Sequence, residues 1–274
     1  MNRFDGKTAV ITGASSGIGE SCARKFVAEG ARVVLAARSA EPLGRLVEEL
    51  GSHVAHAVPT DVSGRAACER LVSETTSRFG GVDILVNNAA FNSRGPVEDL
   101  PIDAMLQILH VNLRGPMMLT KLVLPIMRSQ DSGTIVNVAS LAGRFPLEDE
   151  ATYSATKFAL RVFSFALAEE LRGTNVRVSV VSPGPVETGF IMDEGVIDEV
   201  PALVFSQPMS TADEIADLVL ASAADGARER TKPAFSAKLA TMGYLFPGLR
   251  RALIPVLERK GRAAKKKYLA SRSR

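Results

Sequence analysis

Short apolar runs alternate along this chain with longer stretches in which apolar residues recur every three or four positions. The runs are rich in Val, Ile and Thr and predict strands, whereas the three-to-four spacing predicts helices with one buried face. The expected strands are Thr8–Thr12, Arg32–Ala36, Val54–Val58, Asp83–Asn87, Thr134–Ser140 and Val176–Ser182, and the clearest helical stretches are 17–29, 63–79, 101–128 and 152–172. This alternation predicts an α/β fold: a doubly wound parallel sheet with helices on both faces.

Individual residues indicate where several of these helices begin and end. Glycine favours the left-handed backbone that closes a helix, and three glycines follow helical stretches: Gly30, Gly51 and Gly80. Ser63 is expected to cap the helix that follows it, and Thr211 with Glu214 has the spacing of a capping box. Gly115-Pro116 should bend or interrupt the longest helical stretch, because proline cannot donate a backbone hydrogen bond.

Charge is distributed unevenly along the 274 residues. Residues 226–274 hold 14 lysines and arginines against two acids, whereas the preceding 225 residues hold 19 basic and 28 acidic groups. The net charge of +3 therefore combines an acidic body with a basic tail. We divide the chain near this change into a body, residues 1–235, and a C-terminal extension, residues 236–274, with a last strand expected at Thr231–Phe235.

The extension mixes apolar residues with its many cations, and Pro247 and Pro255 are expected to break it into short helices. A basic amphipathic segment of this kind can rest on a membrane surface, here through residues 239–267. The alternative is a tail packed over a pocket or a neighbouring subunit, with Lys265–Lys267 solvated. Nucleic acid is not expected as a partner, because Trp is absent, aromatic residues are few and no reading motif is present.

The cysteines, the histidines and the apolar runs indicate which kinds of site and location are not expected. Cys22 and Cys68 lack paired spacing, and the three histidines form no cluster with them, so no metal site is expected. No apolar run is long enough to cross a bilayer. The first strand begins almost at once, which leaves no room for a targeting segment. We therefore expect a cytoplasmic protein, either free in the cytoplasm or bound peripherally at a membrane surface.

A glycine-rich turn follows the first strand, in the sequence Thr12-Gly13-Ala14-Ser15-Ser16-Gly17-Ile18-Gly19. Glycines are needed where the backbone turns sharply and where a pyrophosphate approaches the main chain closely. The helix that opens at this turn presents free N–H groups and the positive end of its dipole to an anion. The turn predicts a dinucleotide site, and the alternative is a tight strand-to-helix connection without a ligand.

Tyr153 and Lys157 are four residues apart in an expected helix, so that their side chains share one face. A phenol titrates near pH ~10, too high for ready proton exchange at neutral pH. An ammonium about 4 Å away stabilises the phenolate by about 4 kcal/mol at an effective dielectric of roughly 20, or about three pKa units. The pair is a candidate acid/base, although such spacing also arises by chance. Ser140 lies thirteen residues upstream of the tyrosine.

Together these motifs resemble the short-chain dehydrogenase/reductase family. The matching residues, in chain order over about residues 6–190, are Thr12-Gly13-x-x-x-Gly17-x-Gly19, Asp61, Asn87-Asn88-Ala89-Ala90, Asn112, Ser140, Tyr153-x-x-x-Lys157 and Pro183-Gly184-Pro185-Val186-Glu187-Thr188. The resemblance implies a Rossmann-like domain with a nicotinamide cofactor. It also implies a homodimer or homotetramer that pairs through the helical stretches 101–128 and 152–172.

The resemblance implies a role for each matching residue. Tyr153 would be the acid/base, Lys157 would lower its pKa and bind ribose, and Ser140 would hold the substrate oxygen. Asn112 would place a water against Lys157, its alternative being an asparagine that serves only the helix bend. The implied cofactor-binding residues are Gly13, Ser15, Ser16, Gly17, Ile18, Gly19, Asp61, Val62, Asn88, Ala89, Tyr153, Lys157, Pro183, Val186 and Thr188.

The end of the second strand bears on the choice of cofactor. An acid at this place accepts hydrogen bonds from the ribose 2′-hydroxyl of NAD and repels a 2′-phosphate. Here the sequence is Ala36-Ala37-Arg38-Ser39, with an arginine and no acid. An arginine–phosphate contact contributes about 1.5–3 kcal/mol. Arg38 therefore predicts NADP(H) rather than NAD(H), the alternative being an arginine that is only solvated.

The substrate side of the pocket is expected to be closed by residues 141–149 and 189–209. The second stretch is apolar and resembles the mobile lid of the family. We expect a hydrophobic carbonyl or alcohol, such as a steroid, retinoid, lipid or aromatic ketone, unless the lid packs on the body or on another subunit. The rival hypothesis from another class is an NADP-binding redox sensor that acts through its basic tail.

Overall fold

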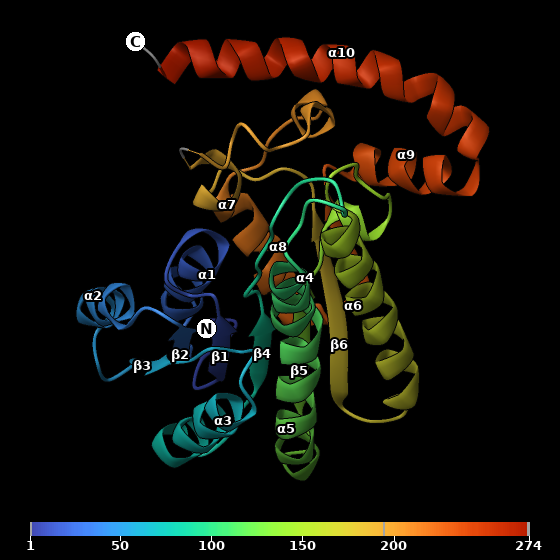
Figure 1. Ribbon diagram of the computed structural model, residues 1–274. Helices are drawn as coiled ribbons and strands as arrows, with labels where there is room; N and C mark the ends of the chain where they lie inside the picture. Colours follow the sequence, from blue (N-terminus) through green and yellow to red (C-terminus); the bar gives the residue numbers. More distant parts are fainter. Residues whose placement is uncertain (1, 194, 273–274) are drawn as a thin grey trace.

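The computed structural model describes residues 2–193 and 195–272. Seven parallel strands form one sheet in the order β3-β2-β1-β4-β5-β6-β7 (Figure 1). The strands are β1 (Thr8–Thr12), β2 (Arg32–Ala37), β3 (Ala55–Pro59), β4 (Ile84–Asn87), β5 (Gly133–Val138), β6 (Val176–Pro183) and β7 (Glu229–Lys232). The chain order reverses direction between β1 and β4, which is the arrangement of a doubly wound Rossmann-like sheet, so the predicted fold class is confirmed.

Helices cover both faces of the sheet. One face packs against α1 (Gly17–Ala28), α2 (Ala40–Leu50) and α8 (Ala212–Asp225), and the other against α3 (Arg65–Phe79), α5 (Gly115–Ser129) and α6 (Ala151–Glu170). The alternation of side chains along a strand explains the two layers. In β1, Ala9 and Ile11 belong to the core beneath α1, whereas Val10 between them belongs to the core beneath α3 and α5.

The predicted interruption near Gly115-Pro116 is present as a change of helix type. Helix α4 (Ile102–Leu109) passes into a π-helical turn at His110–Arg114 before α5 begins at Gly115. Gly115, directly after this turn, allows the segment that follows β3 to approach closely, since a Cβ on Gly115 would lie 2.9 Å from the carbonyl oxygen of Val62.

Helix ends follow the sequence at some places and depart from it at others. The capping box is confirmed: Glu214 donates its N–H to Thr211 Oγ1 at 3.2 Å, and Thr211 donates its own to the Glu214 carboxylate at 3.0 Å. The capping role expected of Ser63 is wrong. Its hydroxyl donates to Asp61 at 2.7 Å, and Gly64 is the residue that precedes α3.

The C-terminal region differs from the prediction in two respects. Strand β7 begins at Glu229 and ends before Pro233, so the expected strand at 231–235 was placed too late. The expected break at Pro255 is also wrong: α9 (Ala234–Leu245) is followed by α10 (Pro247–Arg272), which continues through Pro255. The carbonyl group that Pro255 leaves without its helical donor belongs to the exposed residue Arg251, where water can satisfy it.

Candidate active site

A cavity of about 580 Å³ opens at the carboxyl edge of the sheet. A predicted site residue follows each of the first six strands and lines this cavity, because parallel strands end at the same edge of a sheet. These residues, in chain order, are Gly13, Arg38, Asp61, Asn88, Ser140 and Pro183. All the predicted site residues line the cavity except Gly19 and Asn112.

The glycine turn is held by the end of β4. Asn88 Nδ2 donates to the carbonyl oxygens of Thr12 at 3.0 Å and Gly13 at 3.3 Å, and the N–H groups of Asn88 and Ala89 both donate to Thr12 Oγ1 at 3.0 Å. Gly19 lies behind the turn, where a Cβ would be 2.1 Å from the Gly13 carbonyl oxygen. Sequence reasoning missed the organising role of Thr12, although its place at the head of the motif was a usable signal.

The first turn of α1 fits an anion. Ser16 precedes the helix in extended conformation, and its side chain makes no capping hydrogen bond, so the first helical N–H groups point toward the cavity. Thr188 lies against the same turn, since a Cβ on Gly17 would be 3.0 Å from its methyl carbon. The turn therefore has the shape, the donors and the bare backbone that a pyrophosphate requires.

Arg38 and Asp61 lie at the end of the cavity that adjoins β2 and β3. Arg38 is exposed and forms no ion pair with a described residue, so its guanidinium is available to a phosphate. The Asp61 carboxylate accepts from the N–H of Ser63 at 2.9 Å and from its hydroxyl at 2.7 Å. This end of the cavity therefore presents an exposed guanidinium and a hydrogen-bonded carboxylate.

Tyr153, Lys157 and Ser140 come together at the other end of the cavity. Tyr153 and Lys157 lie in the first two turns of α6, with Lys157 Nζ 5.6 Å from the centre of the tyrosine ring. Lys157 donates to the carbonyl oxygen of Val138 at 3.0 Å. The Ser140 hydroxyl is a hydrogen-bond partner of the Tyr153 phenol and accepts the N–H of Ala142 at 3.1 Å. Three of the four predicted catalytic residues are therefore adjacent.

The pKa values of Tyr153 and Lys157 differ from those that their spacing alone predicts. Burial raises the pKa of Tyr153 above its ordinary value, the charge of Glu150 raises it further, and the hydrogen bond with Ser140 acts in the opposite direction. Burial also lowers the pKa of Lys157 to about 8. The Tyr153 pKa is therefore raised and not lowered as the spacing predicted, because removal of the phenol from water is the largest contribution.

Asn112 lies behind the wall of the cavity, in the π-helical turn. Its side chain is buried in the π-helical turn: it accepts the N–H of Phe91 and donates to the Phe91 carbonyl oxygen, each at 2.8 Å, and it also donates to Thr156 Oγ1 at 3.4 Å. Asn112 thereby joins the turn to the loop after β4 and does not line the cavity. The bent helix explains this, because the π-helical turn directs the amide at that loop.

A buried ion pair on the substrate side escaped sequence reasoning. Arg94 Nε lies 2.6 Å from Glu150 Oε1, and both side chains line the cavity. Arg94 also donates to the carbonyl oxygen of Phe190 at 3.3 Å and lies over its ring. The Phe190 ring in turn packs 5.9 Å from that of Tyr153. The pair therefore connects the catalytic helix to α7 (Gly189–Met192), and Glu150, three residues before Tyr153, was the available signal.

The described residues hold no group of histidine, cysteine, aspartate and glutamate side chains that could bind a metal ion. Within the same part of the chain, no helix is both long enough and apolar enough to cross a membrane.

Comparison with known proteins identifies the family. The short chain dehydrogenase family matches residues 7–195. The chain belongs to the short-chain dehydrogenase/reductase family of oxidoreductases. It is 37% identical over 188 residues to an uncharacterized oxidoreductase of Staphylococcus aureus (strain USA300), covering 69% of this chain and 81% of that protein. A short chain dehydrogenase of Pseudocercospora fijiensis is also 37% identical, over 192 residues that cover 69% and 62% of the two chains.

A solved structure extends the similarity to the fold. The crystal structure of a metagenomic short-chain oxidoreductase in complex with NADP matches with a TM-score of 0.71 and 33% sequence identity. The match covers 84% of this chain and 97% of that one.

In this oxidoreductase the C-terminal helices contribute to the far side of the cavity, beyond Tyr153. The two stretches predicted to close the pocket do line it, and α9 and α10 add a roof of apolar side chains: Leu239, Leu253, Ile254 and Leu257. The roof lies low. A Cβ on Gly261 would be 1.8 Å from the carbonyl oxygen of Ala202, so α10 packs backbone to backbone there. Figure 1 shows α10 lying across the segment that follows α7.

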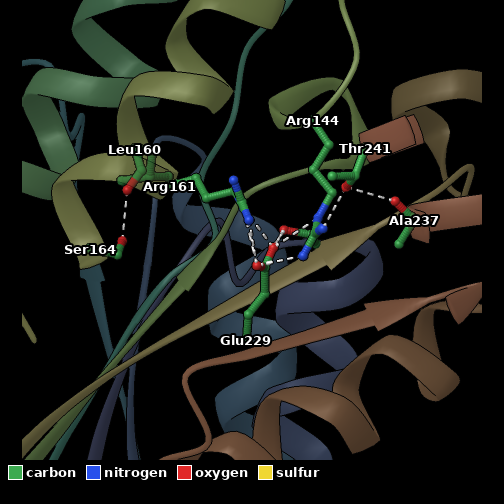
Figure 2. Close-up of polar contacts among 8 residues, drawn as sticks. Arg144, Leu160, Arg161, Ser164, Glu229, Ala237 and Thr241 are labelled. Carbon is green, nitrogen blue, oxygen red and sulfur yellow. Dashed lines mark hydrogen bonds and ion pairs between the residues drawn. The ribbon is translucent and has the colours of Figure 1, made fainter. Parts of the chain in front are cut away.

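A cluster around Glu229 connects this roof to the sheet and to α6 (Figure 2). The Glu229 carboxylate pairs with Arg144 at 2.5 Å and with Arg161 at 3.0 Å, and it accepts the hydroxyl of Ser182 at 2.7 Å. Arg144 also donates to Thr241 in α9 at 2.9 Å. Burial would raise the pKa of Glu229, but hydrogen bonds from Arg161, Ser182 and Arg144 outweigh it and hold the pKa below its ordinary value.

Proposed function

We propose that this chain is an NADP(H)-dependent oxidoreductase that interconverts a carbonyl group and a primary or secondary alcohol on a hydrophobic small molecule. The observation that carries the proposal is the meeting of Ser140, Tyr153 and Lys157 in the cavity that also holds the glycine turn. The bound nicotinamide supplies or accepts the hydride. The other groups that carbonyl reduction requires, a proton donor and a hydrogen-bond donor for the substrate oxygen, belong to the chain.

In reduction, Tyr153 gives its proton to the oxygen as negative charge develops there. The raised pKa of the buried phenol keeps the proton in place until an acceptor arrives. The Ser140 hydroxyl donates to the same oxygen and orients it. Lys157, held by the Val138 carbonyl, supplies positive charge beside the phenol and hydroxyls of the ribose bind near it. In oxidation the same residues act in reverse, with Tyr153 as base.

Two observations support NADP(H) over NAD(H). Arg38 is exposed at the cavity edge, at the end of β2 where an acid would disfavour a 2′-phosphate, and the structurally similar metagenomic oxidoreductase was solved with NADP. The hydrophobic substrate is supported by the character of the far side of the cavity. Apolar side chains from three segments meet there: Leu147, Phe190, Ile191, Val204, Leu239 and Leu253.

The cofactor proposal is tested by titrating the purified protein with NADPH and with NADH and following nucleotide fluorescence. We expect tighter binding of NADPH, and a loss of about ten- to hundredfold in Arg38→Ala without a matching loss for NADH. Arg45→Ala is the control, because Arg45 is also exposed nearby but pairs only with Glu41 in its own helix. Preference for NADH would contradict the proposal for NADP and leave the catalytic group unaffected.

The enzyme proposal is tested with Tyr153→Phe in a screen of apolar ketones, aldehydes and alcohols. We expect turnover to fall by at least about a hundredfold while NADPH binding is retained, because general acid/base catalysis typically contributes 10²–10⁴-fold. A redox sensor acting through its tail would bind the cofactor and have no turnover to lose. Equal turnover in wild type and Tyr153→Phe would contradict the role of this tyrosine.

A further inference from the structure

Helix α9 exposes a row of large apolar side chains. Phe235, Met242 and Leu245 are 77%, 46% and 61% exposed, and their spacing of seven and three residues puts them on one side of the helix. The turn that leads into α10 continues the row with Phe246, which is 54% exposed. Apolar surface of this extent is unusual on a dissolved protein and marks a contact site.

The two C-terminal helices also carry many cations. The segment 234–272 contains ten lysines and arginines and one acid, a net charge of +9, beside a body whose net charge is negative. Two of the cations face the body: Lys265 donates to the carbonyl oxygens of Asp198 and Val200, and Arg250 lies over the ring of Phe145. The exposed cations that form no ion pair with a described residue are Lys238, Arg251, Arg259, Lys260, Lys266 and Lys267.

The apolar row is continuous with the mouth of the cavity. Phe235 is both highly exposed and part of the cavity wall, and Leu239 and Gly243, four and eight residues further along α9, line the interior beside the row. A molecule that covers the row therefore touches the entrance through which a hydrophobic compound would pass.

We infer that α9 and the outer side of α10 dock on an anionic lipid surface, with Phe235, Met242, Leu245 and Phe246 inserted among the lipids and the cations at the headgroups. Apolar and cationic side chains on one surface are the combination that an anionic bilayer binds. Nucleic acid would leave the apolar row unused. A second copy packed face to face would bring two segments of charge +9 together, which electrostatic repulsion opposes.

The inference goes beyond the proposed function and does not depend on it, since lipid binding is measured without turnover. The full chain is sedimented with vesicles of phosphatidylcholine alone and with vesicles containing about a third phosphatidylglycerol. We expect binding to the anionic vesicles, little binding to the neutral ones, and weakening as salt is raised.

Two variants separate the apolar and the ionic contributions. Met242→Ser/Leu245→Ser/Phe246→Ser and Lys266→Glu/Lys267→Glu should each weaken anionic-vesicle binding at least tenfold. The matched controls are Val97→Ser, an exposed apolar residue outside the C-terminal helices, and Arg65→Glu/Arg70→Glu, the same charge change on α3 at the opposite end of the molecule (Figure 1). Both controls should bind as wild type does.

Circular dichroism and thermal melting establish that each variant is folded before its binding is compared. Absence of vesicle binding by the wild type would overturn the inference, and so would equal losses in the test and control variants. Light scattering on the same samples tests the remaining alternative, a second copy of the chain packed on the apolar row. If the triple serine variant loses a subunit contact that the wild type shows without lipid, the row is an interface between copies and the lipid inference is wrong.

Discussion

Arg94 and Glu150 form an ion pair with 2.6 Å between Arg94 Nε and Glu150 Oε1, and their side chains are only 6% and 5% exposed. The pair joins the loop after β4 to the residue just before α6, within one helical turn of Tyr153. Burial raises the pKa of Glu150, and the charge of Arg94 opposes that rise. The arginine, together with a hydrogen bond from Asn92, therefore favours the ionised carboxylate against the cost of its burial.

Arg94→Met should destabilise the protein by about 3–5 kcal/mol at pH 8, because it leaves a buried carboxylate without its partner. The carboxyl of the variant has a pKa well above its unfolded value, so its cost is absent at low pH and grows as the pH rises. Urea unfolding at pH 5 and pH 8 should show a smaller deficit at pH 5.

Arg65→Met is the control for this measurement, since Arg65 pairs with Glu69 on the exposed surface of α3. Its deficit should stay below about 1 kcal/mol at both pH values. A similar, pH-independent loss in the two variants would show that the Arg94–Glu150 pair makes no special contribution.

Gly19→Ala should weaken NADPH binding more than tenfold, because its Cβ would lie 2.1 Å from the Gly13 carbonyl oxygen and force the turn to move. Gly44→Ala is the matched change in α2, where nothing lies within 4 Å of the new Cβ. That variant should keep its affinity and gain about 0.5–1 kcal/mol of stability. Fluorescence titration and thermal melting distinguish the two, and retained affinity in Gly19→Ala would contradict the tight packing of the turn.

The strands, the glycine turn and the Tyr153–Lys157 pair could be predicted because each depends on residues close together in the chain. The Arg94–Glu150 pair joins residues 56 apart, and Arg144 and Glu229 are 85 apart, so no local pattern reveals them. The continuity of α10 through Pro255 depends on solvent access to one carbonyl group, which only the packed structure settles. Prediction therefore succeeded where the determinants are local and missed the polar contacts that assemble the substrate side.

Lys157→Met should abolish turnover and yet stabilise the fold. The folded pKa of Lys157 is about 8 against an ordinary value of 10.5, so protonation of the folded protein is penalised by about 3 kcal/mol. The penalty is fully present below pH 8 and disappears as the pH rises toward 10.5. The stability gained by the variant should accordingly be largest near pH 7 and shrink by pH 10.

Lys25→Met provides the comparison in denaturant unfolding. Lys25 lies near the surface, and its hydrogen bond with Asp217 raises its pKa, so replacing it should bring no gain at any pH. A variant of Lys157 that is less stable than wild type at pH 7 would show that the Val138 hydrogen bond outweighs the cost of burial.

Glu229→Gln should cost about 2–4 kcal/mol at pH 7, because it removes the charge that two arginines share. The folded pKa of Glu229 lies below its ordinary value of 4.5, so its stabilisation exists above that value and is lost as the pH falls through the folded pKa. The difference in unfolding free energy between wild type and variant should therefore shrink below pH 4.5. Glu69→Gln, on an exposed pair, should show little difference at either pH.

The subunit contact implied by family resemblance is open to a direct test. Exposed apolar side chains gather on α4, α5 and α6: Ile102, Leu106, Leu109, Met117 and Val162. We predict that Leu106→Asp/Met117→Asp lowers the molecular mass measured by light scattering, because charge at a dimer interface costs several kcal/mol. The same mass for wild type and variant would place the contact elsewhere.

Gly261 packs so closely against Ala202 that a methyl group at 261 would not fit unless α10 moved. Since the roof helix rests on the loop below it with no side chain between, a methyl group at 261 would act as a spacer and lift α10 along part of its length. Gly261→Ala would therefore enlarge the chamber from outside, without altering any residue that touches the compound inside. Substrate size in this enzyme is then adjustable at a position that catalysis never meets.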